Sequence, residues 1–150
     1  MLHDKGGIMI DIFICEDDPI QLEQFAQMIE KHILIEDLDM QLKVKCQRPN
    51  EILEHIKDTR TSNIYFLDVD LSSDMNGIEL AEQIRFSDPR GFIIFVTSHD
   101  EMTPLTFKYK VEALDYIIKG NSKELSQQIL QCLLNIDSKT SVASPQLMKR

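Results

Sequence analysis

The sequence has no hydrophobic run long enough to cross a membrane. Its longest, Phe92–Val96, is far shorter than the roughly 20 residues that a transmembrane helix needs. The first residues, Met1–Lys5, also lack the cationic-then-apolar order of a secretory signal peptide. We therefore expect a cytoplasmic protein that makes no contact with a membrane.

Basic residues are in the minority. The chain has 16 Lys and Arg residues against 25 Asp and Glu residues, which gives a formal net charge of −9. Nonspecific binding to a phosphate backbone depends on an excess of Lys and Arg. Nucleic-acid binding by this chain alone is therefore not expected.

Cysteine is also scarce. Cys15, Cys46 and Cys132 show no CxxC spacing and lie within hydrophobic segments. An odd number of cysteines in a chain without an export signal is typical of buried free thiols in a reducing cytosol.

With 150 residues, 43% of them hydrophobic and 27% charged, the chain has the size and composition of one globular domain. Short β-rich runs alternate with amphipathic stretches. The pattern predicts strands at 10–15, 40–46, 63–68, 92–97 and 113–118. It predicts helices at 19–34, from Pro49, from about Gly77 and at 124–136, with a weak candidate at 103–111. This alternation predicts an α/β fold, a doubly wound five-stranded parallel sheet with helices on both faces. We expect residues 1–8 to be a disordered leader and 137–150 to be a polar linker or tail.

Reactive side chains follow four of the predicted strands. In open α/β sheets, functional sites lie at the carboxyl ends of the strands. Those ends carry three acids from two strands, with a hydroxyl and a lysine from two more, namely Glu16, Asp17, Asp68, Thr97 and Lys119. Each acid alone would be read as a solvated charge, but their placement at matching strand ends predicts a common site.

Such a set of residues suits phosphoryl chemistry. Clustered carboxylates repel one another, so a cation is expected among them, and an all-oxygen ligand set favours Mg²⁺. A lysine and a hydroxyl facing that ion would meet the oxygens of a phosphoryl group. An aspartate among them could itself be the nucleophile and form an acyl phosphate.

At these positions the chain resembles the receiver domain of bacterial two-component response regulators, over residues 9–136. The motifs occur in the family's order. The acidic pair is in Cys15-Glu16-Asp17-Asp18-Pro19, and the phosphoacceptor motif is Phe66-Leu67-Asp68-Val69, which leads to Asn76-Gly77. The switch-hydroxyl motif is Phe95-Val96-Thr97-Ser98. The switch-aromatic and lysine motif is Tyr116-Ile117-Ile118-Lys119. Finer features resemble the peptide-pheromone regulators of Firmicutes, the AgrA/ComE type, which carry a LytTR DNA-binding domain after the receiver.

The resemblance implies a flavodoxin-like (CheY-like) sheet of order 2-1-3-4-5 and a phosphoacceptor signalling domain rather than an enzyme. Asp68 would take a phosphoryl group from a sensor histidine kinase. Mg²⁺ would be bound directly by Asp17 and Asp68, through water by Glu16, and by the main-chain carbonyl of Asp70.

By the same resemblance, Thr97 and Lys119 would bind the phosphoryl oxygens, and Tyr116 would follow Thr97 inward. The phosphorylated form could form a homodimer and would switch transcription in quorum sensing. DNA would be bound only through the LytTR domain, which this chain lacks, so residues 137–150 would lead toward it.

Two departures from the family pattern bear on the site. Gly120 stands where a proline usually follows the lysine, and a non-proline cis peptide costs about 2.5–4 kcal/mol, so a trans Lys119–Gly120 bond is predicted. The wide φ/ψ range of glycine would still let the ammonium reach the site. The loop from Asp68 to Gly77 is one residue longer than the commonest pattern and lacks its proline, so the outer wall of the metal site is expected to differ from that pattern.

Three other kinds of protein share some of these features. Residues 68–72 resemble the nucleophile motif of haloacid-dehalogenase-type phosphatases, in which Asp68 would be the nucleophile and Asp70 the general acid/base. In that family, however, the nucleophile follows the first strand, and this chain has no room for a cap domain. A flavodoxin-like cofactor binder would need a Ser/Thr/Gly-rich phosphate-binding loop after the first strand. This chain has Glu16-Asp17-Asp18 there, which would repel an anion. The complete set of site residues argues against a degenerate receiver that serves only for interaction.

Overall fold

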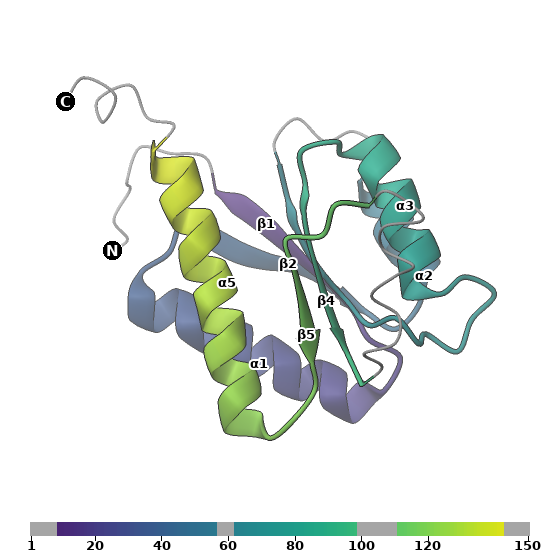
Figure 1. The fold of residues 1–150 in the computed structure, drawn as a ribbon, viewed down its shortest axis with the longest axis horizontal. Helices are drawn as coiled ribbons and strands as arrows, with labels where there is room; N and C mark the ends of the chain where they lie inside the picture. The colour runs from purple at the N-terminus through teal and green to yellow at the C-terminus, as the bar shows by residue number, and fades with distance from the viewer. Residues whose placement is uncertain (1–8, 57–61, 99–110, 143–150) are drawn as a thin grey trace.

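The computed structural model describes residues 9–56, 62–98 and 111–142. Five parallel strands form one sheet in the order β2-β1-β3-β4-β5 (Figure 1), as predicted. The strands are β1 (Ile10–Cys15), β2 (Met40–Cys46), β3 (Ile64–Leu67), β4 (Phe92–Thr97) and β5 (Asp115–Ile118).

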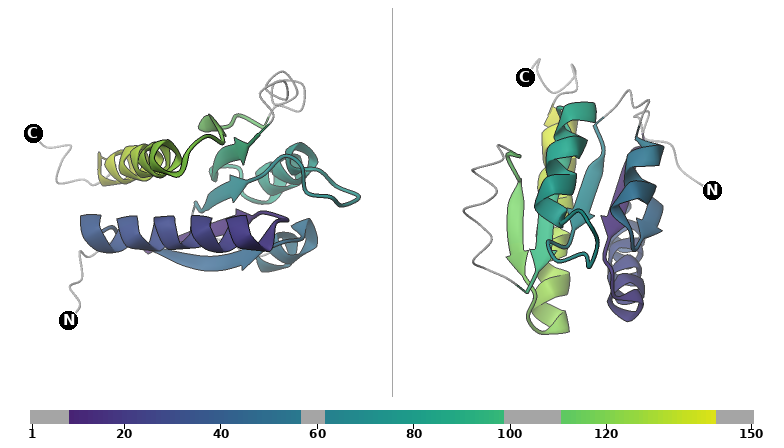
Figure 2. Two further views of the ribbon diagram at one scale, coloured as in Figure 1. Left: turned by 90° about the horizontal axis from the view of Figure 1, so that it is seen from below. Right: turned by 90° about the vertical axis from the view of Figure 1, so that its right-hand side faces the viewer.

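Helices cover both faces of the sheet. Those in the described residues are α1 (Pro19–Glu36), α2 (Pro49–His55), α3 (Gly77–Ser87) and α5 (Ser122–Val142). Helices α1 and α5 lie on one face, and α2 and α3 lie on the other (Figures 1 and 2). Successive residues of a strand point to opposite faces, so Ile12 and Ile14 are buried with α1 and α5, whereas Phe13 and Cys15 are buried with α2 and α3. This double burial explains the nearly continuous hydrophobic runs of the central strands.

The two helices that follow the acidic loops begin at well-formed caps. Asp18 accepts a hydrogen bond from the Ile20 amide at 2.9 Å, and Pro19 occupies the first position of α1, where a missing N–H costs nothing. Asn76 and Glu79 form a capping box at α3, with reciprocal hydrogen bonds of 2.8 and 2.9 Å. These caps fix the exits of the loops after β1 and β3.

Some element boundaries differ from prediction. The strands β3 and β5 are shorter than expected, and α1 reaches Glu36 rather than 34. Helix α5 reaches Val142, although its buried hydrophobic pattern ends at Ile136. Hydrophobic spacing marks only the turns that pack on the sheet, so it missed the turns after Ile136. Residues 138–140 there are exposed, and the Thr140 hydroxyl lies 3.1 Å from the carbonyl of Ile136.

The helix candidate at 103–111 falls outside the described residues except for Val111, which is buried and not helical. The expected leader 1–8 and residues 143–150 of the expected tail also fall outside them. None of the helices in the described ranges is long and apolar enough to cross a membrane. The three cysteines are free and buried, as predicted.

Candidate functional site

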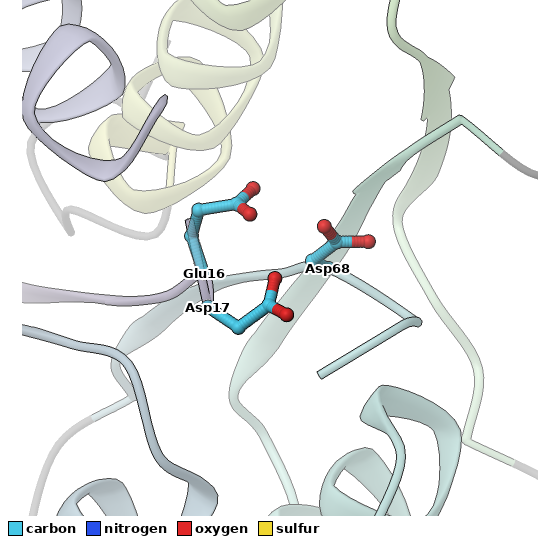
Figure 3. A group of neighbouring side chains, drawn as sticks. All are labelled: Glu16, Asp17 and Asp68. Atoms are coloured by element: carbon cyan, nitrogen blue, oxygen red, sulfur yellow. The ribbon is translucent and has the colours of Figure 1, made fainter. Parts of the chain in front are cut away.

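Three carboxylates meet where β1 and β3 end. Glu16 and Asp17 directly follow β1, Asp68 directly follows β3, and each offers an oxygen within 4.8 Å of the other two. The Asp68 amide donates a hydrogen bond of 3.0 Å to the carbonyl of Cys15, which extends the pairing of the two strands up to the acids. Figure 3 shows the three side chains gathered around a common space. The structure therefore brings these predicted residues together.

The cluster is largely withdrawn from water. Glu16 is 3% exposed and Asp68 is 7% exposed, while Asp17 is half-buried. Burial raises the pKa of Glu16 to about 7; the hydrogen bond from Lys119 opposes this rise, and the nearby charge of Asp68 adds to it. The site therefore holds negative charge at a free-energy cost that a bound cation would relieve.

Lys119 joins the cluster from the end of β5. Its Nζ donates hydrogen bonds to Glu16 Oε1 at 2.8 Å and to Asp68 Oδ2 at 2.9 Å. Burial alone would lower the pKa of Lys119, but its hydrogen bonds to the two carboxylates and their charges outweigh burial and raise it. The ammonium therefore stays charged at neutral pH and partly neutralises the cluster.

The donor set fits a hard divalent cation. Mg²⁺ binds oxygens at about 2.0–2.1 Å, so two of its ligands lie at most about 4.2 Å apart. The three carboxylate oxygens, all within 4.8 Å of one another, need only small side-chain movements to share one ion. Both oxygens of Glu16 already accept protein hydrogen bonds, one from Lys119 and one of 3.2 Å from the Asp18 amide.

Asp70 lies in the loop after β3. Its amide donates a hydrogen bond of 3.2 Å to Asp68 Oδ1, and the residue is exposed. The two oxygens of Asp68 thus have different neighbours, the loop amide on one side and the Lys119 ammonium on the other. The role of the Asp70 carbonyl as a metal ligand stays a prediction.

Thr97 and Tyr116 lie on the neighbouring strands β4 and β5, and β4 pairs with the strand that Asp68 follows. Thr97 ends β4 and is fully buried, and the Tyr116 ring on β5 is half-buried with its centroid 5.6 Å from that of Phe95. The Lys119 amide donates to the Thr97 carbonyl at 2.7 Å, so the hydroxyl-bearing and lysine-bearing strand ends are held side by side. The switching roles of both side chains stay predictions.

The departure at Gly120 has the predicted outcome. The described residues contain no cis peptide bond, so the Lys119–Gly120 bond is trans. The ammonium nevertheless reaches both Glu16 and Asp68.

Two further residues of the site were not identified as such from the sequence. Gln21, in the first turn of α1, accepts a hydrogen bond of 2.7 Å from Lys119 Nζ, although nothing in the sequence marks this glutamine. Gly77 appeared only as part of the Asn76-Gly77 pair, whereas the structure shows that a Cβ there would lie 2.0 Å from the main-chain oxygen of Asp68. That close approach becomes visible only in three dimensions.

The fold and the acidic cluster define a class of signalling domain. The family model of the response regulator receiver domain matches residues 12–131. The chain therefore belongs to the response regulator receiver domain family. It is a signalling domain of a two-component system rather than an enzyme, and Asp68 follows the third strand, unlike a haloacid-dehalogenase nucleophile.

Among curated proteins, the chain is 49% identical over 122 residues to accessory gene regulator protein A of Staphylococcus aureus (strain N315). The match covers 81% of this chain and 51% of that protein, so the chain spans about half the length of the curated relatives it matches. The predicted likeness to the AgrA type is thus confirmed.

Two solved structures share the fold. The response regulatory domain of MrkE from Klebsiella pneumoniae gives a TM-score of 0.70 at 22% identity, covering 87% of this chain and 99% of that one. The response regulator TrrA of Thermotoga maritima, solved in complex with Mg²⁺-BeF, gives a TM-score of 0.64 at 17% identity, covering 83% and 99%. At these identities the likeness shows the fold.

Proposed function

We propose that this domain takes a phosphoryl group from a sensor histidine kinase onto Asp68 in the presence of Mg²⁺. The observation that carries the proposal is the position of Asp68. Its buried carboxylate has an oxygen within 4.8 Å of oxygens of Glu16 and Asp17, and it accepts a 2.9 Å hydrogen bond from Lys119. A nucleophile, a set of cation ligands and a fixed positive charge thus converge at one point.

In the proposed transfer, the bond between phosphorus and a nitrogen of the kinase's phosphohistidine breaks as a carboxylate oxygen of Asp68 bonds to phosphorus. The electron pair leaves with the nitrogen, which takes up a proton, and Asp68 becomes an acyl phosphate. Lys119 and the Thr97 hydroxyl would bind the phosphoryl oxygens, and Tyr116 would follow Thr97 inward. Electrostatic stabilisation of the transferring group is the main contribution a protein makes to such a reaction.

Mg²⁺, when bound, would neutralise the carboxylates and the charge that develops on the phosphoryl oxygens. Asp17 and Asp68 would bind it directly, with the main-chain carbonyl of Asp70. Glu16 would act through water, which agrees with the engagement of both its oxygens by Lys119 and the Asp18 amide.

The biological output belongs to the same proposal. Similarity to accessory gene regulator protein A supports a role in peptide-pheromone quorum sensing, with transcription as the output. DNA would be bound through a LytTR domain that follows the receiver, with residues 137–150 as the connection. Phosphorylation-dependent homodimerisation and a cytoplasmic location complete the proposal.

Incubation with Mg²⁺ and phosphoramidate or acetyl phosphate, followed by intact-mass measurement, tests the assignment. We expect one added phosphoryl group, which is absent in EDTA and in Asp68→Asn. Asp70→Asn is the matched control and should still be labelled, because its carboxylate is not among the three that converge. Undiminished labelling of Asp68→Asn would place the acceptor elsewhere, with Asp70 as the next candidate.

A further inference from the structure

A closed ring of hydrogen bonds ties Lys119 to the first turn of α1. Lys119 Nζ donates to Gln21 Oε1 at 2.7 Å, and Gln21 Nε2 donates to Asp18 Oδ2 at 3.1 Å. The Asp18 amide donates to Glu16 Oε2 at 3.2 Å, and Glu16 Oε1 accepts the 2.8 Å bond from Lys119. The ring thus runs through one acid of the cluster and through the cap of the helix.

The chemistry of its two neighbours fixes the orientation of the Gln21 amide. An ammonium only donates hydrogen bonds and an ionised carboxylate only accepts them. The amide oxygen must therefore face Lys119 and the amide nitrogen must face Asp18, as they do in the structure. Asp18 is itself held by the amides of Ile20 and Gln21, at 2.9 and 3.4 Å.

Gln21 differs from the other two partners of Lys119. An ammonium has three N–H donors, and Glu16, Asp68 and Gln21 provide three acceptors for them. Glu16 and Asp68 also belong to the acidic cluster that a cation would engage. Gln21 is neutral and lies outside that cluster, so it is the partner that Lys119 can keep when the carboxylates turn to a cation and a phosphoryl oxygen needs a donor.

We propose that Gln21 is a positioning residue that anchors the Lys119 ammonium beside Asp68 while the phosphoryl group is received. This inference rests on the proposed function of Asp68. Without the Gln21 oxygen, Lys119 would lose this neutral anchor and become more mobile, and it would stabilise the phosphoryl oxygens less.

The test compares Gln21→Leu with Gln24→Leu, a matched control on an exposed position of the same helix. Gln21→Ala serves as a second variant if the leucine perturbs folding, which thermal melts would show. The probes are beryllofluoride with Mg²⁺, as a phosphoryl analogue, and the rate of labelling by phosphoramidate. A third readout is the ¹⁵N resonance of the Lys119 ammonium in the unphosphorylated protein, assigned by its loss in Lys119→Arg.

We expect Gln21→Leu to weaken beryllofluoride binding and slow labelling by about three- to tenfold, the size of one partly exposed hydrogen bond to a charged group. We also expect the Lys119 ammonium signal to broaden through faster exchange with water. Gln24→Leu should match the wild type in all three measurements.

The outcomes separate the two proposals. If the wild type binds no beryllofluoride and takes no phosphoryl group, the proposed function of Asp68 fails, and this inference fails with it. If the wild type does both and Gln21→Leu behaves like Gln24→Leu, only the role of Gln21 is overturned. Weaker binding with an unchanged Lys119 resonance would also overturn it, because the effect would not act through the lysine.

Discussion

Gly77, the first residue of α3, packs directly against the backbone of Asp68, and a Cβ atom on it would lie only 2.0 Å from the Asp68 main-chain oxygen. The Gly77 amide also donates a hydrogen bond of 2.8 Å to the carbonyl of Val69. The backbone of Gly77 thus contacts the backbone of Asp68 and Val69 directly, which brings together the two ends of the loop that carries Asp70. Any side chain at position 77 would push apart the start of α3 and the residue proposed to be phosphorylated.

Gly77→Ala should therefore destabilise the fold by about 2–3 kcal/mol, since the clash is with main-chain atoms that cannot rotate away. Urea unfolding measures the change. Gly120→Ala is the matched control, because its nearest contact, at 3.3 Å, is the mobile end of the Glu124 side chain, and a change within about 0.5 kcal/mol is expected. A Gly77→Ala protein as stable as the wild type would show that the loop can move aside freely.

Lys119→Met should bind Mg²⁺ several-fold more tightly than the wild type. The ammonium lies 2.8 and 2.9 Å from two carboxylates of the cluster, so its positive charge opposes the entry of a second cation. An ammonium and a divalent ion about 5 Å apart repel by roughly 7 kcal/mol at an effective dielectric near 20, and solvent screening reduces this value to a fraction. Isothermal titration calorimetry with MgCl₂ measures the affinity.

Lys45→Met serves as the control for charge alone, because Lys45 pairs with Glu23 at 2.6 Å on the exposed surface. Its Mg²⁺ affinity should equal that of the wild type. Weaker Mg²⁺ binding by Lys119→Met would mean that the lysine organises the carboxylates for the ion rather than competing with it.

The sequence predicted which acidic side chains meet better than it predicted where the helices and strands end. The strand ends identified Glu16, Asp17 and Asp68 correctly as neighbours, because a parallel sheet brings all its carboxyl ends to one edge. The end of α5 was missed because residues 137–140, which follow Ile136 in the helix, include no buried side chain. Gln21 was missed because its role depends on Lys119, which lies almost a hundred residues away in the chain.

Sequence periodicity also gave no hint of a buried polar network on the face of the sheet that α2 and α3 cover. Asp88 Oδ2 accepts hydrogen bonds from the Tyr65 hydroxyl at 2.8 Å and from the Asn63 amide at 3.1 Å, and all three residues are buried. A tyrosine in a hydrophobic strand is expected to pack as a large apolar side chain. Only the fold shows that its hydroxyl meets an acid at the end of α3.

Tyr65→Phe should cost about 1.5–3 kcal/mol of stability, because the buried side chain of Asp88 loses a hydrogen bond. Equilibrium unfolding in urea gives the value. The affinity for Mg²⁺ should stay unchanged. The Tyr65 hydroxyl meets Asn63, which precedes β3, whereas the acidic cluster lies after the other end of that strand. A stability equal to that of the wild type would mean that Asp88 finds another donor.

The three thiols should differ in reactivity in a defined order. A hydrogen bond with Cys46, together with burial, raises the pKa of Cys15, and burial raises the pKa of Cys132 to about 12, aided by the charge of Asp115. The same hydrogen bond lowers the pKa of Cys46, its register partner across β1 and β2. At pH 8 only about one Cys132 side chain in ten thousand would be a thiolate, since each pKa unit is a factor of ten.

We therefore expect iodoacetamide to label the native protein slowly at all three sites, with Cys46 first, and to label all three rapidly in urea. Peptide mass spectrometry over a time course gives the order. Labelling of Cys132 before Cys46 would contradict the prediction. Cys46→Ser should leave Cys132 as protected as before, because burial and Asp115, not Cys46, raise the pKa of that thiol.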